Sequence, residues 1–271
     1  MRGTNSTARP NRLGGLGIYA VAYLIFIYLP VLLLPLFSVN DALYVAFPIK
    51  GLTLEWYVEA LVHENMLRAL WNSIRVGGCV AVISTCLGLL AAKALTWYRL
   101  AGAGIVMGFV SIPLVIPLII LGISLLVVSS RIGLELSLFT IGLGHVVLTV
   151  PVSVFVLMSR LEGFDRSIEE AALDLGETPW MTFWRVTFPM ALPGIVASLL
   201  LTFTLSFDEF LLAFFLAGDQ LTLPVYIWSQ LRFPARLPSV LALGSMIIMG
   251  TFLLVVVAEW VRRSGSGRFE V

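Results

Sequence analysis

Long apolar stretches, separated by short polar ones, run along the whole chain. A helix that crosses the hydrocarbon core of a bilayer needs about 20 consecutive, mostly apolar residues. Six segments have this length and character: residues 16–38, 73–96, 103–128, 138–158, 194–216 and 239–261. We therefore predict a transmembrane domain of six helices over residues 16–261, with short tails at residues 1–15 and 262–271.

The composition agrees with this pattern and excludes a soluble globular protein. Hydrophobic residues make up 59% of the 271 residues, whereas Asp, Glu, Lys and Arg together make up only 12%. Soluble domains carry about 25% charged residues, and no long segment is polar enough to form such a domain. We predict an all-α integral membrane protein.

The distribution of Lys and Arg predicts how the helices are oriented. Cytoplasmic loops carry an excess of these residues. With both termini in the cytoplasm, eleven of the 17 basic residues lie inside and six outside. The first apolar run follows three arginines, but it exceeds the 7–15 residues, roughly, of a signal-peptide core. We expect it to be retained as the first span.

Small residues and prolines predict contacts and bends within the spans. A stripe of small residues runs along the second span: Gly77, Ala81, Ser84, Gly88 and Ala92. Such a stripe lets another helix approach closely. Pro113, Pro117 and Pro151 each leave a backbone carbonyl without its helical partner, which predicts kinked helices. Such kinks have two interpretations: hinges of a moving gate, or ordinary features of helix packing.

A polar segment, residues 159–193, lies on the predicted cytoplasmic side between the fourth and fifth spans. Ser167 followed by Glu170 matches a capping box, in which two side chains satisfy each other's backbone N–H groups. Apolar positions then recur at helical spacing, and Gly176 stands where a short helix would end, since glycine tolerates left-handed backbone. The pattern predicts a short amphipathic helix.

A second short helix is predicted to follow directly. Thr178 and Pro179 suit its N-cap and first position, and Pro189 is predicted to end it. The resulting hairpin has two interpretations: an interfacial element with its aromatic side chains at headgroup level, or a docking element for a cytoplasmic partner. The small alanines of the first helix favour protein contact, whereas the second helix fits both interpretations.

The hairpin also carries a spaced motif. Glu170-Ala171-Ala172, three residues, Gly176, nine residues, Val186, one residue and Phe188-Pro189 follow one another. This resembles the signature E-A-A-x3-G-x9-I-x-L-P of binding-protein-dependent ABC importer permeases, with Val in place of Ile and Phe in place of Leu. In that family the segment is a coupling helix that docks on an ATPase. The resemblance implies that docking here falls to Glu170, Ala171, Ala172, Asp174 and Gly176.

Further similarity extends over nearly the whole chain. The segments concerned are FSVN at 37–40, GLTLEWY at 51–57, NSI at 72–74, SRLEGFDRSIEEAALDLG at 159–176, LSFDEF at 205–210 and LPVYIWSQLR at 223–232. Their order and spacing resemble the second permease of spermidine/putrescine importers, which implies a type I ABC importer fold and a polyamine solute. The same subfamily includes permeases for opines, phosphonates, other amino-acid-like solutes and ferric iron, which remain alternatives.

The resemblance also implies partners. The chain contains two lysines, Lys50 and Lys93, and neither belongs to a G-x-x-x-x-G-K-[ST] phosphate loop. We expect no cofactor in this chain, with ATP and Mg²⁺ bound by two separate ATPase subunits. A second, different permease and an extracytoplasmic solute-binding protein would complete the assembly in the bacterial cytoplasmic (inner) membrane. No nucleic acid is expected.

Two carboxylates in the fifth span are the candidate substrate residues. Asp208 would lie roughly 21 Å above the cytoplasmic end, at about 1.5 Å per residue, and Glu209 follows it. A carboxylate inside a bilayer costs at least about 2.5 kcal/mol, so both should face the protein interior or the outer mouth. They would attract a cationic solute, with Phe207 and Trp228 adding cation–π contacts. The alternatives are a structural pair, with Arg232 or the partner permease, and simple exposure at the mouth.

Two other function classes fit less well. An intramembrane enzyme would need a motif such as H-E-x-x-H, a D-x-x-x-D pair or a serine–histidine pair, and the chain has only two histidines, His63 and His145. A stand-alone secondary carrier would leave the capped hairpin unexplained. We predict a transporter subunit that is not an enzyme, and we assign no catalytic or metal-binding residue.

Overall fold

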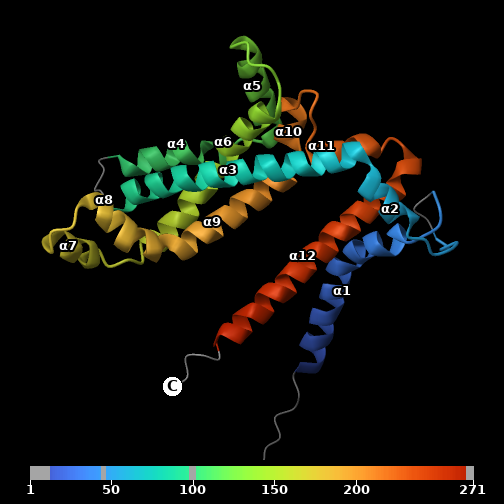
Figure 1. Ribbon diagram of the computed structural model, residues 1–271, viewed down its shortest axis with the longest axis horizontal. Helices are drawn as coiled ribbons and strands as arrows, with labels where there is room; N and C mark the ends of the chain where they lie inside the picture. Colours follow the sequence, from blue (N-terminus) through green and yellow to red (C-terminus); the bar gives the residue numbers. More distant parts are fainter. Residues whose placement is uncertain (1–12, 44–46, 98–101, 267–271) are drawn as a thin grey trace, which may run out of the picture. The chain divides into compact units, whose positions relative to one another are not determined.

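The computed structural model describes residues 13–43, 47–97 and 102–266 (Figure 1). The expected tails, 1–15 and 262–271, lie largely outside these residues. The described residues form helices and contain no strand beyond one isolated bridge between Asn40 and Leu52. The expectation of an all-α protein is confirmed.

The chain divides into two compact units. The larger unit spans Glu64–Ser229, and the other combines the residues up to His63 with those from Gln230 onward. The larger unit contains α3 (Glu64–Trp97), α4 (Ala103–Val115), α5 (Leu118–Arg131), α6 (Leu138–Leu161), α7 (Ser167–Asp174), α8 (Pro179–Thr182), the π-helix η1 (Phe183–Thr187), α9 (Phe188–Asp208), α10 (Leu211–Leu216) and all but the last residue of α11 (Leu223–Gln230).

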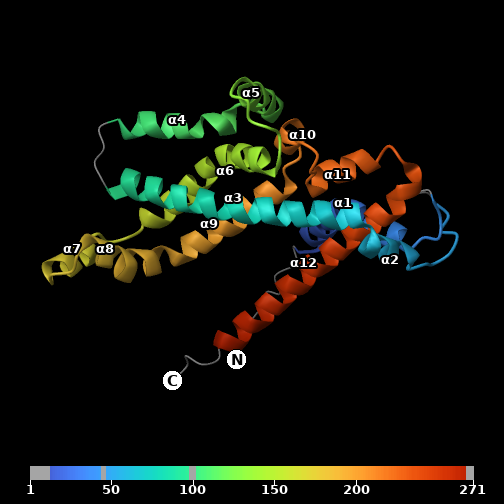
Figure 2. The same ribbon diagram turned by 45° about the horizontal axis from the view of Figure 1, so that its top comes forward.

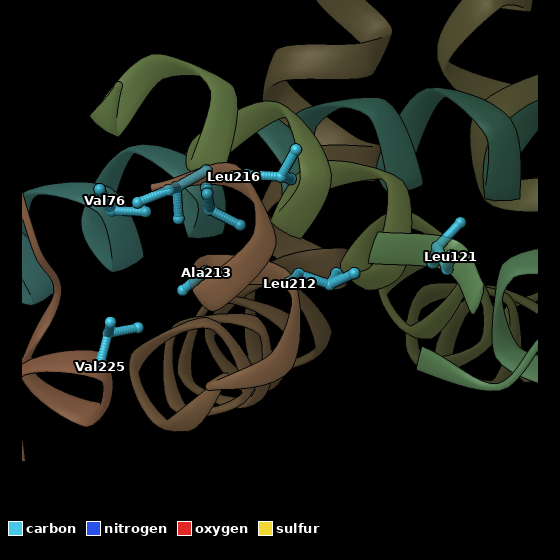
Figure 3. Packing of buried hydrophobic residues seen from close by; sticks show 8 residues of the cluster. Val76, Leu121, Leu212, Ala213, Leu216 and Val225 are labelled. Atoms are coloured by element: carbon cyan, nitrogen blue, oxygen red, sulfur yellow. The ribbon is translucent and has the colours of Figure 1, made fainter. Parts of the chain in front are cut away.

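Helices α3, α6 and α9 lie side by side and form the centre of the larger unit (Figures 1 and 2). One buried cluster joins α3 and α6 to the short helix α10, where Leu212, Ala213 and Leu216 are almost completely buried (Figure 3). A second cluster lies further along α3 and contains Leu89, Ala92, Leu157, Leu161, Ala191 and Ile195. Apolar burial therefore fixes α3 against its neighbours at two levels.

The small-residue stripe on α3 provides the close approach that the sequence predicts. All five of its residues are buried. A Cβ atom added to Gly88 would lie 2.1 Å from the Ser153 Oγ and 3.0 Å from the backbone carbon of the same residue. Only glycine therefore lets α3 and α6 pack at this distance.

Hydroxyl groups link the three central helices where they approach most closely. Ser84 on α3 hydrogen-bonds to Thr149 on α6 at 2.7 Å. Ser198 on α9 hydrogen-bonds both to Thr85 on α3, at 2.9 Å, and to Ser153 on α6, at 2.7 Å. Such bonds satisfy polar groups that apolar surroundings would otherwise leave without partners. They also fix the rotation of each helix about its axis.

The predicted third span is broken in the structure. Helices α4 and α5 meet at Ile116 and Pro117 and are bent by 100° relative to each other. Proline lacks an N–H group and disfavours helical backbone at the residue before it, and Ile116 accordingly has an extended ψ of 131°. Pro113 and Pro151, by contrast, lie inside helices that continue past them.

The fifth apolar helix is longer at its start than the sequence predicts. Helices α8, η1 and α9 form one continuous span over Pro179–Asp208. The prediction that Pro189 ends the second hairpin helix is wrong. The backbone widens into a π-turn, in which the Phe188 N–H donates to the Phe183 carbonyl five residues earlier. A π-turn placed just before proline accommodates its ring and its missing donor without ending the helix.

The second unit contains α1 (Leu13–Ser38), α2 (Glu55–Val62), the 3₁₀-helix η2 (Pro234–Arg236) and α12 (Leu237–Ser266). Helices α1 and α12 pack together, and the Ser38 Oγ lies 3.3 Å from the Ser245 Oγ and 2.7 Å from the Tyr57 Oη. In the described residues of both units, five helices are long and apolar enough to cross a membrane. A sixth crossing results if α4 and α5 count as one.

Candidate functional site

The polar segment between α6 and α9 folds into the expected hairpin, which lies at one end of the central helices (Figures 1 and 2). Its first cap differs from the prediction. Ser167 is the first residue of α7, and its N–H donates to the Asp165 Oδ1 at 3.0 Å. The predicted capping box between Ser167 and Glu170 is therefore wrong. Asp165, and not Glu170, accepts the hydrogen bond from the Ser167 N–H. The bond holds the pKa of Asp165 below its usual range.

The turn between the two hairpin helices forms as predicted. Gly176 has a φ of 90° and its N–H donates to the Leu173 carbonyl, while the Glu177 N–H donates to the Ala172 carbonyl at 3.1 Å. These two bonds define a Schellman motif. Thr178 then caps α8, since its Oγ1 accepts a hydrogen bond from the Met181 N–H at 3.3 Å. Both sides of the turn are thus fixed by local bonds.

The predicted docking residues lie together on the solvent-exposed side of this hairpin. Glu170, Ala171, Asp174 and Gly176 are exposed, and Ala172 is half-buried. Apolar side chains are exposed beside them: Leu175 at 87%, Trp180 at 67%, and also Ile168, Leu173, Met181 and Trp184. A cluster of exposed apolar residues bordered by acids is typical of a surface that another molecule covers.

Glu169 has a different environment, although it directly precedes Glu170. It is half-buried, and its Oε1 lies 3.3 Å from the Nζ of Lys93, near the end of α3. The apolar pattern of residues 168–175 places Glu169 away from the apolar face of α7 and so does not predict this half-buried contact. No short-range signal could reveal a contact between residues so far apart in sequence, although Lys93 is one of only two lysines in the chain.

Aromatic rings fill the junction between the hairpin and α9. Trp184 packs on Trp180 and Phe188, with ring centroids 5.6 and 5.0 Å apart, and Phe183 lies 5.3 Å from Trp184. Phe183 also receives the Lys93 Nζ, 5.0 Å from its centroid. The second hairpin helix is therefore continuous with the transmembrane span and packed onto it.

Three of the four candidate substrate residues, Phe207, Asp208 and Glu209, lie at the opposite end of α9, and the four do not form one cluster. Asp208 ends α9 and is exposed, and no cation pairs with it within the described residues of its unit. Glu209 caps the next helix, because its Oε1 accepts a hydrogen bond from the Leu212 N–H at 3.0 Å. Phe207 stacks on Phe203. Only Asp208 therefore combines a charge with exposure and the lack of a partner.

Trp228, the fourth candidate residue, belongs to α11 and packs against one aromatic residue. Its ring centroid is 5.5 Å from that of Phe210, which separates α9 from α10. The helix break at Glu209 and Phe210 brings this pair together, since Phe210 precedes α10 and Trp228 belongs to α11. A continuous span over residues 194–216 would not predict this contact.

The sequence and the fold both match those of known transporter components. Residues 84–265 match the family described as binding-protein-dependent transport system inner membrane component. The putrescine transport system permease protein PotI of Escherichia coli (strain K12) is 36% identical over 231 residues, which cover 82% of each chain. The spermidine/putrescine transport system permease protein PotC of the same strain is 29% identical over 248 residues, covering 91% of this chain and 93% of the relative.

A solved structure has the same fold. A bacterial ABC transporter involved in the import of the acidic polysaccharide alginate matches with a TM-score of 0.70 at 17% sequence identity, over 96% of this chain and 99% of that chain. The resemblance to ABC importer permeases and the expected fold class are thus confirmed. Members of this family are transport subunits that carry no cofactor of their own, rather than enzymes. The chain belongs to the family of inner membrane components of binding-protein-dependent transport systems, as a multi-pass permease subunit of an ABC importer.

Proposed function

We propose that this permease imports a polyamine such as putrescine or spermidine, and that residues 159–193 couple it to a separate ATPase. The observation that supports coupling most strongly is the exposed hairpin, capped at its turn by Gly176 and Thr178, which presents Glu170, Ala171 and Ala172 together. The solute class is supported by the names of the two relatives, a putrescine permease and a spermidine/putrescine permease.

The exposed side chains of α7 indicate which kind of partner surface could bind there. The small side chain of Ala171 lets a partner surface approach the helix closely. Glu170 and Asp174 offer carboxylates for charge-assisted hydrogen bonds with basic groups on the ATPase. The almost fully exposed Leu175 offers apolar area that docking would remove from water. The arrangement thus suits a partner with a basic, partly apolar groove.

The proposed assembly contains this chain, a second and different permease, two ATPase subunits and an extracytoplasmic solute-binding protein. ATP and Mg²⁺ bind to the ATPase subunits, whose closure moves the hairpins and turns the paired permeases between inward-open and outward-open states by rigid-body rocking. Each permease contributes half of the translocation pathway. Both termini of this chain and its hairpin lie in the cytoplasm, in agreement with the positions of Lys and Arg.

Asp208 is the proposed contact for the cationic solute. It is exposed at the C-terminal end of α9, where the helix macrodipole adds partial negative charge to that of the carboxylate. A polyamine carries two or more ammonium groups, so a carboxylate reinforced in this way favours its entry into the pathway. The nearby rings of Phe207, Phe210 and Trp228 supply apolar and cation–π surface for its methylene chain.

Replacing Asp208 tests the solute proposal. We expect Asp208→Asn to lower uptake of radiolabelled putrescine into proteoliposomes at least about fivefold, since it removes one charge contact with the solute. Asp219→Asn, which removes another exposed carboxylate of the same unit, serves as the matched control. Undiminished uptake by an intact Asp208→Asn complex would remove Asp208 from the pathway. Uptake of an opine, a phosphonate or ferric iron, without polyamine uptake, would refute the solute class and leave coupling intact.

A further inference from the structure

The hairpin is joined to α3 by one half-buried ion pair. The Lys93 Nζ lies 3.3 Å from the Glu169 Oε1, and the two side chains are only 22% and 18% exposed. The same ammonium lies over the rings of Trp97, at 4.4 Å, and Phe183, at 5.0 Å. Exposed ion pairs contribute little because water screens them. This pair is largely shielded from water, and aromatic faces hold its cation in place.

Glu169 also contacts the start of α9. Its Oε1 accepts a second hydrogen bond, from the Oγ1 of Thr187. Thr187 is buried and is the last residue of η1, directly before α9 begins. One carboxylate oxygen therefore joins three elements: α7 through its own backbone, α3 through Lys93, and α9 through Thr187.

A second contact between the hairpin and α3 lies nearby. The guanidinium of Arg166 donates hydrogen bonds to the carbonyls of Thr96 and Trp97, the last two residues of α3. The final carbonyls of a helix have no partner within it and carry partial negative charge, so a cation is well placed there. The N-terminal end of α7 is thus held to α3 at two points, by Glu169 and by Arg166, which directly precedes the helix.

The adjacent acids Glu169 and Glu170 therefore face in different directions. Successive residues of a helix are rotated by about 100°, which turns Glu169 toward α3 and leaves Glu170 exposed on the docking surface. An ATPase can contact Glu170, Ala171 and Asp174 without disturbing the pair between Glu169 and Lys93.

We propose that Lys93 and Glu169 are positioning residues of the coupling step. Their ion pair makes α7, α3 and α9 move as one body, so a displacement of the hairpin by the ATPase reaches the spans that line the pathway. This inference rests on the proposed docking function of the hairpin. It assigns transmission of movement to Glu169 and contact with the ATPase to Glu170. Without the pair, the docked hairpin shifts relative to α3 and the movement is lost.

The test measures transport and hydrolysis in the same reconstituted complex. Complexes carrying Lys93→Gln or Glu169→Gln are placed in proteoliposomes, and putrescine uptake and ATP hydrolysis are recorded together with the amount of ATPase retained. We expect each single variant to retain the ATPase and to lower uptake per ATP at least about fivefold, the lower end of typical coupling effects.

A conservative variant separates coupling from folding. Lys93→Arg keeps a cation that can pair with Glu169 and lie over the rings of Trp97 and Phe183. We expect it to recover a large part of the uptake per ATP that Lys93→Gln loses. Arg185→Gln and Glu162→Gln are matched controls, because they remove exposed charges that do not join the hairpin to α3. Both should behave as wild type.

Three results would overturn the inference. Normal uptake per ATP in both single variants would show that the pair transmits nothing. Uptake per ATP in Lys93→Arg no better than in Lys93→Gln would show that the positive charge at residue 93 transmits nothing. Loss of the ATPase from the Glu169→Gln complex would place Glu169 on the docking surface. Retention of the ATPase by Glu170→Lys would instead contradict the proposed docking, while uptake per ATP would still decide the role of Lys93 and Glu169.

Discussion

The backbone at Gly176 has a φ of 90°, and a Cβ atom added there would meet no other atom within 4 Å. Any difficulty with a larger residue therefore comes from the backbone and not from crowding. Left-handed backbone costs a residue with a side chain about 1–2 kcal/mol. The direction in which the chain leaves α7, and hence the placing of α8 and its aromatic residues, depends on this one residue.

Substituting Gly176 should therefore weaken docking without disturbing the spans. We expect Gly176→Ala to lower the amount of ATPase retained by the purified complex about fivefold or more, in proportion to the left-handed cost, and Gly176→Asn to have a smaller effect. Gly163→Ala, in the same loop but at ordinary φ and with only an ordinary contact at 3.7 Å, is the control. Equal retention by Gly176→Ala and Gly163→Ala would contradict the role given to the turn.

Features of the hairpin that depend on neighbouring residues could be predicted from the sequence, and those that depend on distant ones could not. Gly176 and Thr178 act through bonds within a few positions, so their identity alone reveals the turn. The capping box does not form because Asp165, and not Glu170, accepts from the Ser167 N–H, while the Glu170 N–H donates to the Arg166 carbonyl. The contact between Glu169 and Lys93 depends on how α7 lies against α3, which no local pattern encodes.

At the scale of helices, α3 and α6 are held together by apolar packing, hydroxyl pairs and the absence of a side chain at Gly88. The stripe of small residues on α3 predicts a close helix contact. It does not show that the partner residue is Ser153, because all the other spans are also apolar and contain small residues. Membrane helices associate through such packing and hydrogen bonds, since lipid and protein are similarly apolar.

Adding one methyl group to this contact should destabilise the helix pair. A Cβ atom at Gly88 would lie 2.7 Å from the Ser153 Cβ and 3.0 Å from its backbone, so a rotamer change alone cannot relieve the clash. Overpacking of this kind costs about 1–3 kcal/mol. We expect Gly88→Ala to lower the thermal unfolding midpoint of the detergent-purified chain. Gly78→Ala, on the same helix with open space around it, should leave the midpoint unchanged, and equal midpoints would refute the packing argument.

Two prolines of similar appearance in the sequence have opposite effects on their helices. At Pro117 the chain turns by 100° between α4 and α5, whereas the helix continues through Pro189 by means of the π-turn. The difference arises from packing: Phe183, Trp184 and Phe188 form a ring cluster around the π-turn. Proline alone predicts a disturbance of the helix, and the tertiary surroundings decide between a break and a bulge.

For the whole molecule, the pattern of apolar runs sufficed to predict a helical membrane protein, and the motif in residues 159–193 sufficed to predict its family. Both inferences rest on properties repeated over many residues. The bent pair of α4 and α5, and the early start of the helix at Pro179, depend on single residues and their neighbours in space. The proposed solute contact rests on one residue, Asp208, which has no structural partner in the described part of its unit.

The central claim is that the outer face of α7 docks on an ATPase. Its most direct test is purification of the chain from its native membrane in mild detergent, with quantification of the ATPase that remains bound. We predict that the wild-type chain and Glu162→Lys, a charge reversal outside the docking surface, retain the ATPase. Glu170→Lys should lower the amount of bound ATPase about tenfold or more, because the charge reversal turns an attractive contact into repulsion. Equal retention by Glu170→Lys, or no ATPase bound to the wild-type chain, would contradict the account.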